Sequence, residues 1–152
     1  MWRWHKHDNL KDAKDAFIRA VTYEQSPEHP ETVFIRLATI LAEEGNHADA
    51  LRHYLMAAEV CPTALAWTGV GICSLRLNQL EQAEDALAEA NLLDPLDAEV
   101  WGYLSLLCLQ TGRKLEAEQS FKFAAKLKLH NPQLMSEIRQ LQQKCGFGDP
   151  SY

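Results

Sequence analysis

The chain has 152 residues, of which 47% are hydrophobic and 24% charged, and its formal net charge is −6. This length suits one domain, and an acidic chain without a long basic run is a poor binder of nucleic acid, whose affinity comes largely from phosphate neutralisation. No apolar run approaches the roughly 20 residues that span a bilayer, and the N-terminus lacks the apolar segment of a signal peptide. We therefore expect a cytoplasmic protein without membrane contact.

Residues 1–30 are predicted to form a partial unit, a helix pair that begins partway through its first helix. Ala13, Phe17 and Ala20 have the spacing that marks a second helix in the units described next, and Trp4 fits the helix before it. Half a unit would expose apolar side chains, so we expect the chain to be the end of a longer protein. We also consider self-association through this N-terminal half-unit.

Three full units of 33 or 34 residues follow, covering residues 31–63, 64–97 and 98–131. Each predicts a helix, a short turn, a second helix and a connection. An early aromatic, two later alanines and a large residue between those alanines recur in register: Phe34, Trp67 and Trp101; Ala50, Ala83 and Ala117; Tyr54, Leu87 and Phe121; Ala57, Ala90 and Ala124. Gly45, Asn78 and Gly112 mark the turns. Because one unit cannot bury its apolar face alone, we expect the units to stack into a solenoid.

Residues 132–145 are predicted to form a C-terminal capping helix, followed by a tail at 146–152. Asn131 followed by Pro132 is a favourable helix start, since asparagine caps the first turn and proline suits the first helical position. Leu134, Ile138 and Leu141 then share one face of an otherwise polar helix. The predicted total is eight helices, the first of them truncated.

This pattern resembles the tetratricopeptide repeat (TPR), whose units carry an aromatic, Leu-Gly, Ala, an aromatic, Ala and Pro. Ala38 and Ser105 replace the glycine of that pattern in the first and third units, but both are small residues. The resemblance implies an all-α fold, a tetratricopeptide-repeat α-solenoid of antiparallel helix pairs with a C-terminal capping helix. It also implies protein partners, no enzyme activity and no cofactor.

Residues 68–152 further resemble the C-terminal repeats of cilia- and flagella-associated axonemal proteins. The resemblance is carried by AEDALAEAN, AEVWGYLSLLCL, GRKLEAEQSFK and the closing GFGDPSY. It implies a component of the central apparatus of motile cilia, located in the cytoskeleton of the cilium or flagellum. Our hypothesis is a non-enzymatic scaffold module that docks onto neighbouring axonemal or other ciliary proteins and takes part in the assembly or regulation of motile cilia.

In the tetratricopeptide-repeat family the first helix of each unit lines a concave face that usually holds the ligand. By resemblance, the partner-binding groove of this chain consists of Ile35, Thr39, Thr68, Gly69, Ile72, Leu75, Arg76, Gly102, Tyr103, Leu106 and Leu109. Its apolar stripe favours an amphipathic helix or another apolar segment of a protein partner. The alternative is that neighbouring helices of the same protein cover these residues.

A soluble co-chaperone or peptide-binding adaptor of the cytosol is the alternative function. Family members that grip the C-terminal carboxylate of heat-shock chaperones use a clamp of Lys and Asn, then Asn, then Lys and Arg. The matching positions here are Ile35 and Thr39, then Gly69, then Glu99 and Tyr103. No clamp residue is present, and Glu99 would repel a carboxylate.

Gly69 and Gly71 form a G-x-G pair, which opens many phosphate-binding loops. A dinucleotide loop needs a third glycine and a preceding strand, but Ser74 occupies that place within a predicted helix. We assign Gly71 to the small-residue position where paired helices touch. Gly69 should instead face the groove, and its cost of about 1 kcal/mol relative to alanine suggests that something approaches its backbone.

The remaining candidates for chemistry have structural interpretations. His5 and His7 are two residues apart, so on a helix they point to different sides and do not meet one metal ion. The basic, aromatic MWRWHKH stretch could lie on a membrane surface, but its aromatics coincide with repeat positions and favour core packing. The four cysteines form no C-x-x-C motif and are expected to be buried, reduced thiols: Cys61, Cys73, Cys108 and Cys145.

Overall fold

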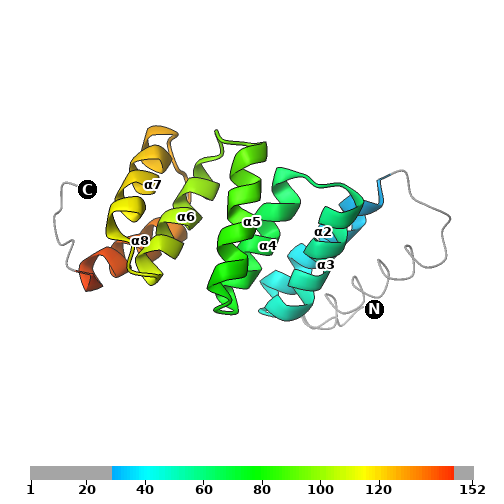
Figure 1. Ribbon diagram of the computed structural model, residues 1–152. Helices are drawn as coiled ribbons and strands as arrows, with labels where there is room; N and C mark the ends of the chain where they lie inside the picture. Colours follow the sequence, from blue (N-terminus) through cyan, green and yellow to red (C-terminus); the bar gives the residue numbers. More distant parts are fainter. Residues whose placement is uncertain (1–28, 146–152) are drawn as a thin grey trace, which may run out of the picture.

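The computed structural model describes residues 29–145 as a row of α-helices (Figure 1). The helices are α2 (Pro30–Glu43), α3 (His47–Val60), α4 (Ala64–Arg76), α5 (Leu80–Leu93), α6 (Ala98–Gln110), α7 (Lys114–Lys126) and α8 (Pro132–Lys144). This part of the chain contains no strand, so the prediction of an all-α solenoid is confirmed. The predicted N-terminal half-unit and the C-terminal tail lie outside the described residues.

The helices pair as the repeat predicts. α2 packs on α3, α4 on α5 and α6 on α7, and successive pairs are joined by contacts of α3 with α4 and of α5 with α6. In Figure 1, α3 and α5 lie nearer the viewer than α2 and α4. The solenoid thus has one face built from second helices and an opposite face built from first helices.

Each turn inside a pair contains one residue with left-handed backbone geometry. Gly45, Asn78 and Gly112 have φ angles of 85°, 61° and 79°. Glycine adopts this geometry without steric cost and asparagine tolerates it, which explains why these residue types recur there. Lys128, with φ of 63°, is a further case shortly before α8, and its residue type does not predict this geometry.

Small residues allow the paired helices to approach closely. A side chain at Gly71 would place its Cβ 2.6 Å from Cγ of Leu87 on the paired helix, which confirms the role predicted for Gly71. Ala38 occupies the equivalent place in the first unit and is fully buried. Ser105 does so in the third, and its hydroxyl donates a 2.8 Å hydrogen bond to the carbonyl oxygen of Ala117 on α7.

The last helix, α8, packs in a different way from the first helices before it. Asn131 caps it by accepting a hydrogen bond from the backbone N–H of Leu134, and Leu134 and Ile138 are buried. Whereas α4 and α6 each pack on the preceding second helix, α8 packs on α6, and within residues 29–145 the backbone of α8 does not approach that of α7 closely. The capping helix therefore covers the first helix of the last unit.

No helix in the described part of the chain combines the length and the hydrophobicity that crossing a bilayer would require.

Candidate functional site

The C-terminal part of the predicted groove is covered by α8. Leu75, Leu106 and Leu109 are only 5%, 0% and 4% exposed, and they share one core cluster with Leu134 and Ile138 of α8. Tyr103 belongs to the same buried cluster. An open apolar stripe therefore does not exist at these positions, because the protein's own helix fills the place where a partner was expected.

An ion pair also links α8 to α4. Arg76 of α4 donates two hydrogen bonds to the carboxylate of Glu137, at 2.8 and 2.9 Å. Hydrogen bonding to Glu137 raises the pKa of Arg76. Such a two-point contact fixes orientation more than a single hydrogen bond does, although the pair is partly exposed and its net stabilisation is modest. Of the predicted groove residues, Arg76 is thus already engaged within the chain.

Gly69 does not face an open groove, contrary to the prediction. It is buried, and a Cβ at this position would lie 2.4 Å from ring carbons of Tyr54 on α3. The Tyr54 hydroxyl lies 3.0 Å from Oγ1 of Thr39, which itself donates to the carbonyl oxygen of Ile35 at 2.8 Å. Because the threonine proton is used in that bond, the tyrosine donates to Thr39. The unexplained close neighbour of Gly69 is therefore an aromatic ring of the preceding unit.

Gly102 has a similar explanation at the other end of the solenoid. A Cβ there would lie 2.8 Å from Cδ2 of Leu134 and 3.1 Å from Cδ2 of Leu129. The glycine lets the cap and the segment before it close over α6. Both groove glycines thus serve contacts within the chain, with Tyr54 and Leu134 as partners that the repeat pattern does not predict.

The part of the groove that remains accessible lies on α2 and α4. Thr39 is exposed, and Ile35 and Ile72 are half-buried. Thr68 is buried and donates its hydroxyl proton to the carbonyl oxygen of Ala64 at 2.7 Å. Within the described chain, the predicted groove is therefore reduced to a short surface in the first two full units.

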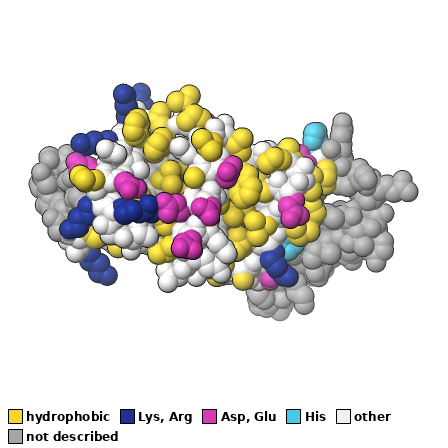
Figure 2. All heavy atoms as spheres, in the orientation of Figure 1, with side chains coloured by type: hydrophobic (Ala, Val, Ile, Leu, Met, Phe, Trp, Pro, Cys, Tyr) yellow, Lys and Arg dark blue, Asp and Glu magenta, His cyan; other side chains and the backbone are white. Residues whose placement is uncertain are grey.

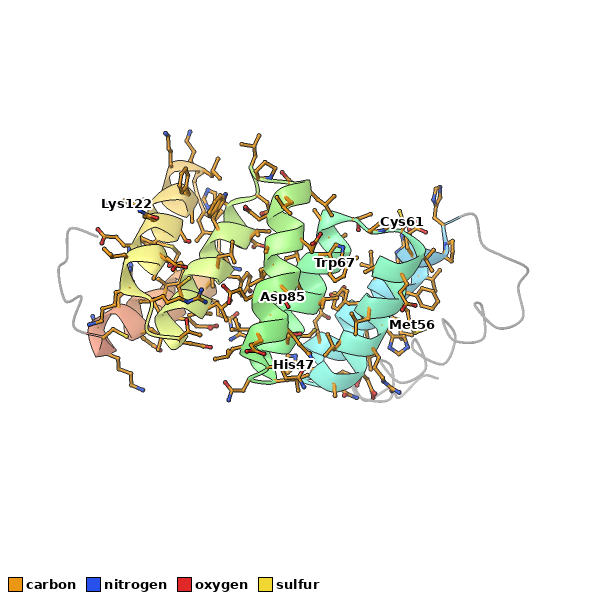
Figure 3. The ribbon with its side chains drawn as sticks, viewed as in Figure 1. His47, Met56, Cys61, Trp67, Asp85 and Lys122 are labelled. Carbon is orange, nitrogen blue, oxygen red and sulfur yellow. The ribbon has the colours of Figure 1, made fainter. Side chains whose placement is uncertain are left out.

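A second concave surface, which the sequence analysis did not predict, lies between α3 and α5. This hollow has a volume of about 480 Å³ and is lined by Leu51 and Leu55 of α3, Trp67 and Val70 of α4, and Asp85 and Glu89 of α5 among others. Figure 3 shows Trp67 between the two second helices, with Asp85 on α5. We call this surface the α3–α5 hollow.

Metal-ligating side chains and cysteines are the groups that could carry chemistry in the described part of the chain. Within residues 29–145 no group of three or more His, Cys, Asp or Glu side chains is arranged to hold a metal ion. The four cysteines are free thiols, and burial raises the pKa of Cys73 to about 11. A thiol with such a pKa stays protonated near neutral pH and is a poor nucleophile.

Comparison with known protein families gives a match over almost the whole chain. The family described as the Cilia and flagella-associated protein 70 C-terminal domain matches residues 3–146. Cilia- and flagella-associated protein 70 of Homo sapiens is 43% identical over 144 residues, which are 95% of this chain and 13% of that protein. The protein of the same name from Macaca fascicularis is 44% identical over 90% of this chain and 14% of its own length. The chain thus spans about an eighth of the length of these relatives.

Solved structures with a similar fold are more distant in sequence. The crystal structure of MamA has a TM-score of 0.77 at 16% identity, over 95% of this chain and 87% of that one. A tetratricopeptide repeat protein from Parabacteroides merdae has a TM-score of 0.78 at 20% identity, over 93% and 56%. The first TPR of Spaghetti (RPAP3), bound to an HSP90 peptide, has a TM-score of 0.67 at 16% identity, over 75% and 91%. At these identities the likeness shows the fold alone.

Proposed function

The chain belongs to the family of the Cilia and flagella-associated protein 70 C-terminal domain, and from this membership we propose that it is a non-enzymatic protein-interaction scaffold of the ciliary or flagellar axoneme. Its role is to dock a longer protein onto neighbouring ciliary proteins during the assembly or regulation of motile cilia. The family match over residues 3–146 is the observation that carries the proposal. The solenoid supports it, because stacked repeats present long surfaces to other proteins.

The accessible part of the groove is the first surface that we assign to a partner. Ile35, Thr39 and Ile72 are at least partly exposed there, and Arg36 is exposed next to Thr39, three residues later on α2. Because α8 fills the groove beside α6, a partner helix lies along α2 and α4 and ends where α8 begins. The buried positions Leu75, Gly102, Tyr103, Leu106 and Leu109 pack with α8 or the segment before it and do not touch the partner.

A receptor for acidic chaperone tails is the weaker candidate. Two similar folds hold such peptides, SRMEEVD of HSP90 and SGPTIEEVD of HSP70. In this chain the corresponding surface contains Gly69 beneath the ring of Tyr54, and Glu99 accepts a hydrogen bond from the side chain of Asn131. The nearby cation Arg76 is paired with Glu137. A peptide carboxylate would therefore meet no available cation at the clamp positions.

Proximity labelling in ciliated cells tests the scaffold proposal. The full-length protein is compared with a version that lacks residues 1–152, and we expect axonemal neighbours to be labelled by the first and lost from the second. An unchanged set of neighbours would overturn the scaffold role of this region.

Two matched charge reversals test the groove itself. Arg36→Glu changes the exposed groove face of α2, whereas Arg52→Glu makes the same change on α3, where Arg52 is paired only with Asp49 of its own helix among the described residues. We expect loss of labelled neighbours with Arg36→Glu alone. Equal labelling by both variants would show that the partner uses another face.

A further inference from the structure

The α3–α5 hollow lies between two neighbouring second helices. Within the described residues α3 and α5 both pack on α4, and the backbones of α3 and α5 do not approach each other closely. The space between them has Trp67 and Val70 of α4 as its floor and Leu51 and Leu55 as one wall. Leu55 is 41% exposed although it is a large apolar side chain. The hollow is therefore an accessible apolar surface on the side built from second helices.

The equivalent position in the next unit shows why this hollow is open. Trp101 of α6 stands 34 residues after Trp67 and is covered by Phe123 of α7, with ring centroids 4.8 Å apart and an interplanar angle of 22°. The residue 34 positions before Phe123 is Glu89. A carboxylate on α5 thus replaces the aromatic ring that would close the hollow over Trp67.

Trp67 also differs from Trp101 in its hydrogen bonding. The indole N–H of Trp101 donates to the carbonyl oxygen of Pro95 at 2.8 Å. No hydrogen bond to another of residues 29–145 engages the indole of Trp67. A half-buried tryptophan whose indole N–H has no partner within residues 29–145 and whose ring is only partly covered is the type of side chain that anchors protein interfaces.

The charge on the rim of the hollow has one sign. Asp85 and Glu89 line it, and neither takes part in an ion pair within the described residues. The sequence of α5 contains four acidic residues and no Lys or Arg, and in the described part of the chain only Glu84 among these acids forms an ion pair, with Arg113 of the next unit. Figure 2 shows acidic side chains along α5 beside the hydrophobic band that separates it from α3.

We propose that the α3–α5 hollow binds an amphipathic helical segment of a partner protein, with Lys or Arg residues flanking its apolar face. The apolar residues of this segment cover Trp67 and Leu55, and its basic residues pair with Asp85 and Glu89. The two wall helices have 14 residues each, so a segment of similar length, about 21 Å, fits along them. This surface is separate from the groove on α2 and α4, and a chain could use both at once.

A synthetic peptide of about 14 residues, with Leu on one helical face and Lys on the other, is the probe. Its binding to the 152-residue chain is measured by fluorescence anisotropy and compared with that of the same peptide carrying Glu in place of Lys. We expect the Lys peptide to bind at least about tenfold more tightly, and its affinity to fall with added salt. Equal affinities for the two peptides would overturn the proposal.

Leu55→Glu separates a specific site from general attraction between an acidic protein and a basic peptide. It adds negative charge but removes apolar surface from the hollow, so the proposal expects binding to weaken about tenfold. Leu92→Glu is the matched control, since Leu92 is 77% exposed at the end of α5 and does not line the hollow. If both variants bind the Lys peptide more tightly than the parent chain, the binding is non-specific charge attraction and the proposed site is overturned.

Glu89→Phe provides a second variant, which copies the arrangement of Trp101 and Phe123. The new ring should stack on Trp67, close the hollow and abolish peptide binding. Gln119→Phe on α7 is the control, and this variant should still bind the peptide. Full binding by Glu89→Phe would refute the assignment. The parent chain could instead dimerise and fail to bind the peptide. If Glu89→Phe then abolished the dimer, the occupant of the hollow would be a second copy of the chain, and the proposal would be overturned. None of these outcomes affects the ciliary role, which proximity labelling tests.

Discussion

Gly69→Ala should destabilise the protein, although alanine is the better helix former. The new Cβ would lie 2.4 Å from two ring carbons of Tyr54 and 2.7 Å from its Cγ, which is the ring atom nearest the backbone. Because Cγ is among the overlapping atoms, rotating the ring about its χ2 axis does not relieve the overlap. The whole Tyr54 side chain or the helix that carries residue 69 must therefore shift. A shift of Tyr54 also disturbs its 3.0 Å hydrogen bond with Thr39.

The expected magnitude follows from three opposing contributions. Overpacking of a buried site costs about 1–3 kcal/mol, and loss of a hydrogen bond costs about 0.5–1.5 kcal/mol. Replacing a helical glycine by alanine returns about 1 kcal/mol. We therefore expect Gly69→Ala to lower the free energy of unfolding by about 2 kcal/mol. Urea unfolding followed by circular dichroism measures this change.

Two comparisons make this prediction specific. Gly102→Ala should be close to neutral, because its new Cβ would meet the terminal methyl groups of Leu134 and Leu129, which can turn away. In a Tyr54→Ala background the overlap is absent, and Gly69→Ala should stabilise by about 1 kcal/mol. A neutral or stabilising effect of Gly69→Ala in the parent chain would refute the packing of Tyr54 on Gly69. It would also restore the interpretation that Gly69 faces an open groove.

Three further predictions concern burial. Burial raises the pKa of Cys73 from 9.0 to about 11, so as pH rises the thiol loses its proton in the unfolded chain before it does in the folded chain. The free energy of unfolding should therefore fall as pH rises from about 9 to 11. Unfolding measurements should show a weaker pH dependence for Cys73→Ala. Ala83→Leu should lower the thermal unfolding midpoint, because overpacking at this buried site costs about 1–3 kcal/mol. Ala88→Leu, on the exposed side of α5, should leave the midpoint unchanged. Equal midpoints for the two variants would contradict the assigned helix contact of Ala83. Leu106→Glu should reduce helical content measured by circular dichroism, because it places an unpaired carboxylate in a fully buried site; native content would show that α8 does not cover it.

The position of α8 illustrates what the sequence could not provide. The pattern of Leu134, Ile138 and Leu141 predicts that one face of the helix is buried, and Leu134 and Ile138 are indeed fully or nearly fully buried. An amphipathic pattern does not say which neighbour provides the other surface. Only the fold shows that α8 covers α6, and this contact removes half of the predicted groove.

The α3–α5 hollow could have been suspected from the sequence by comparing units. Aligning the second and third units places Glu89 opposite Phe123 in a register where Trp67 and Trp101 coincide. This difference indicates that Trp67 lacks the aromatic neighbour on the paired helix that Trp101 has. Whether this difference leaves an open hollow depends on the distance between α3 and α5. Residue spacing in the sequence does not give that distance.

The sequence by itself determined the repeat register, the turn positions and the small residues between paired helices. These features depend on local geometry that recurs every 33 or 34 residues, such as left-handed turns at Gly45 and Gly112 and helix contact at Gly71. The tertiary structure alone decided which surfaces remain accessible. Exposure depends on contacts between residues distant in sequence, as when Tyr54 covers Gly69 and Leu134 covers Gly102, and a periodic pattern does not specify such contacts.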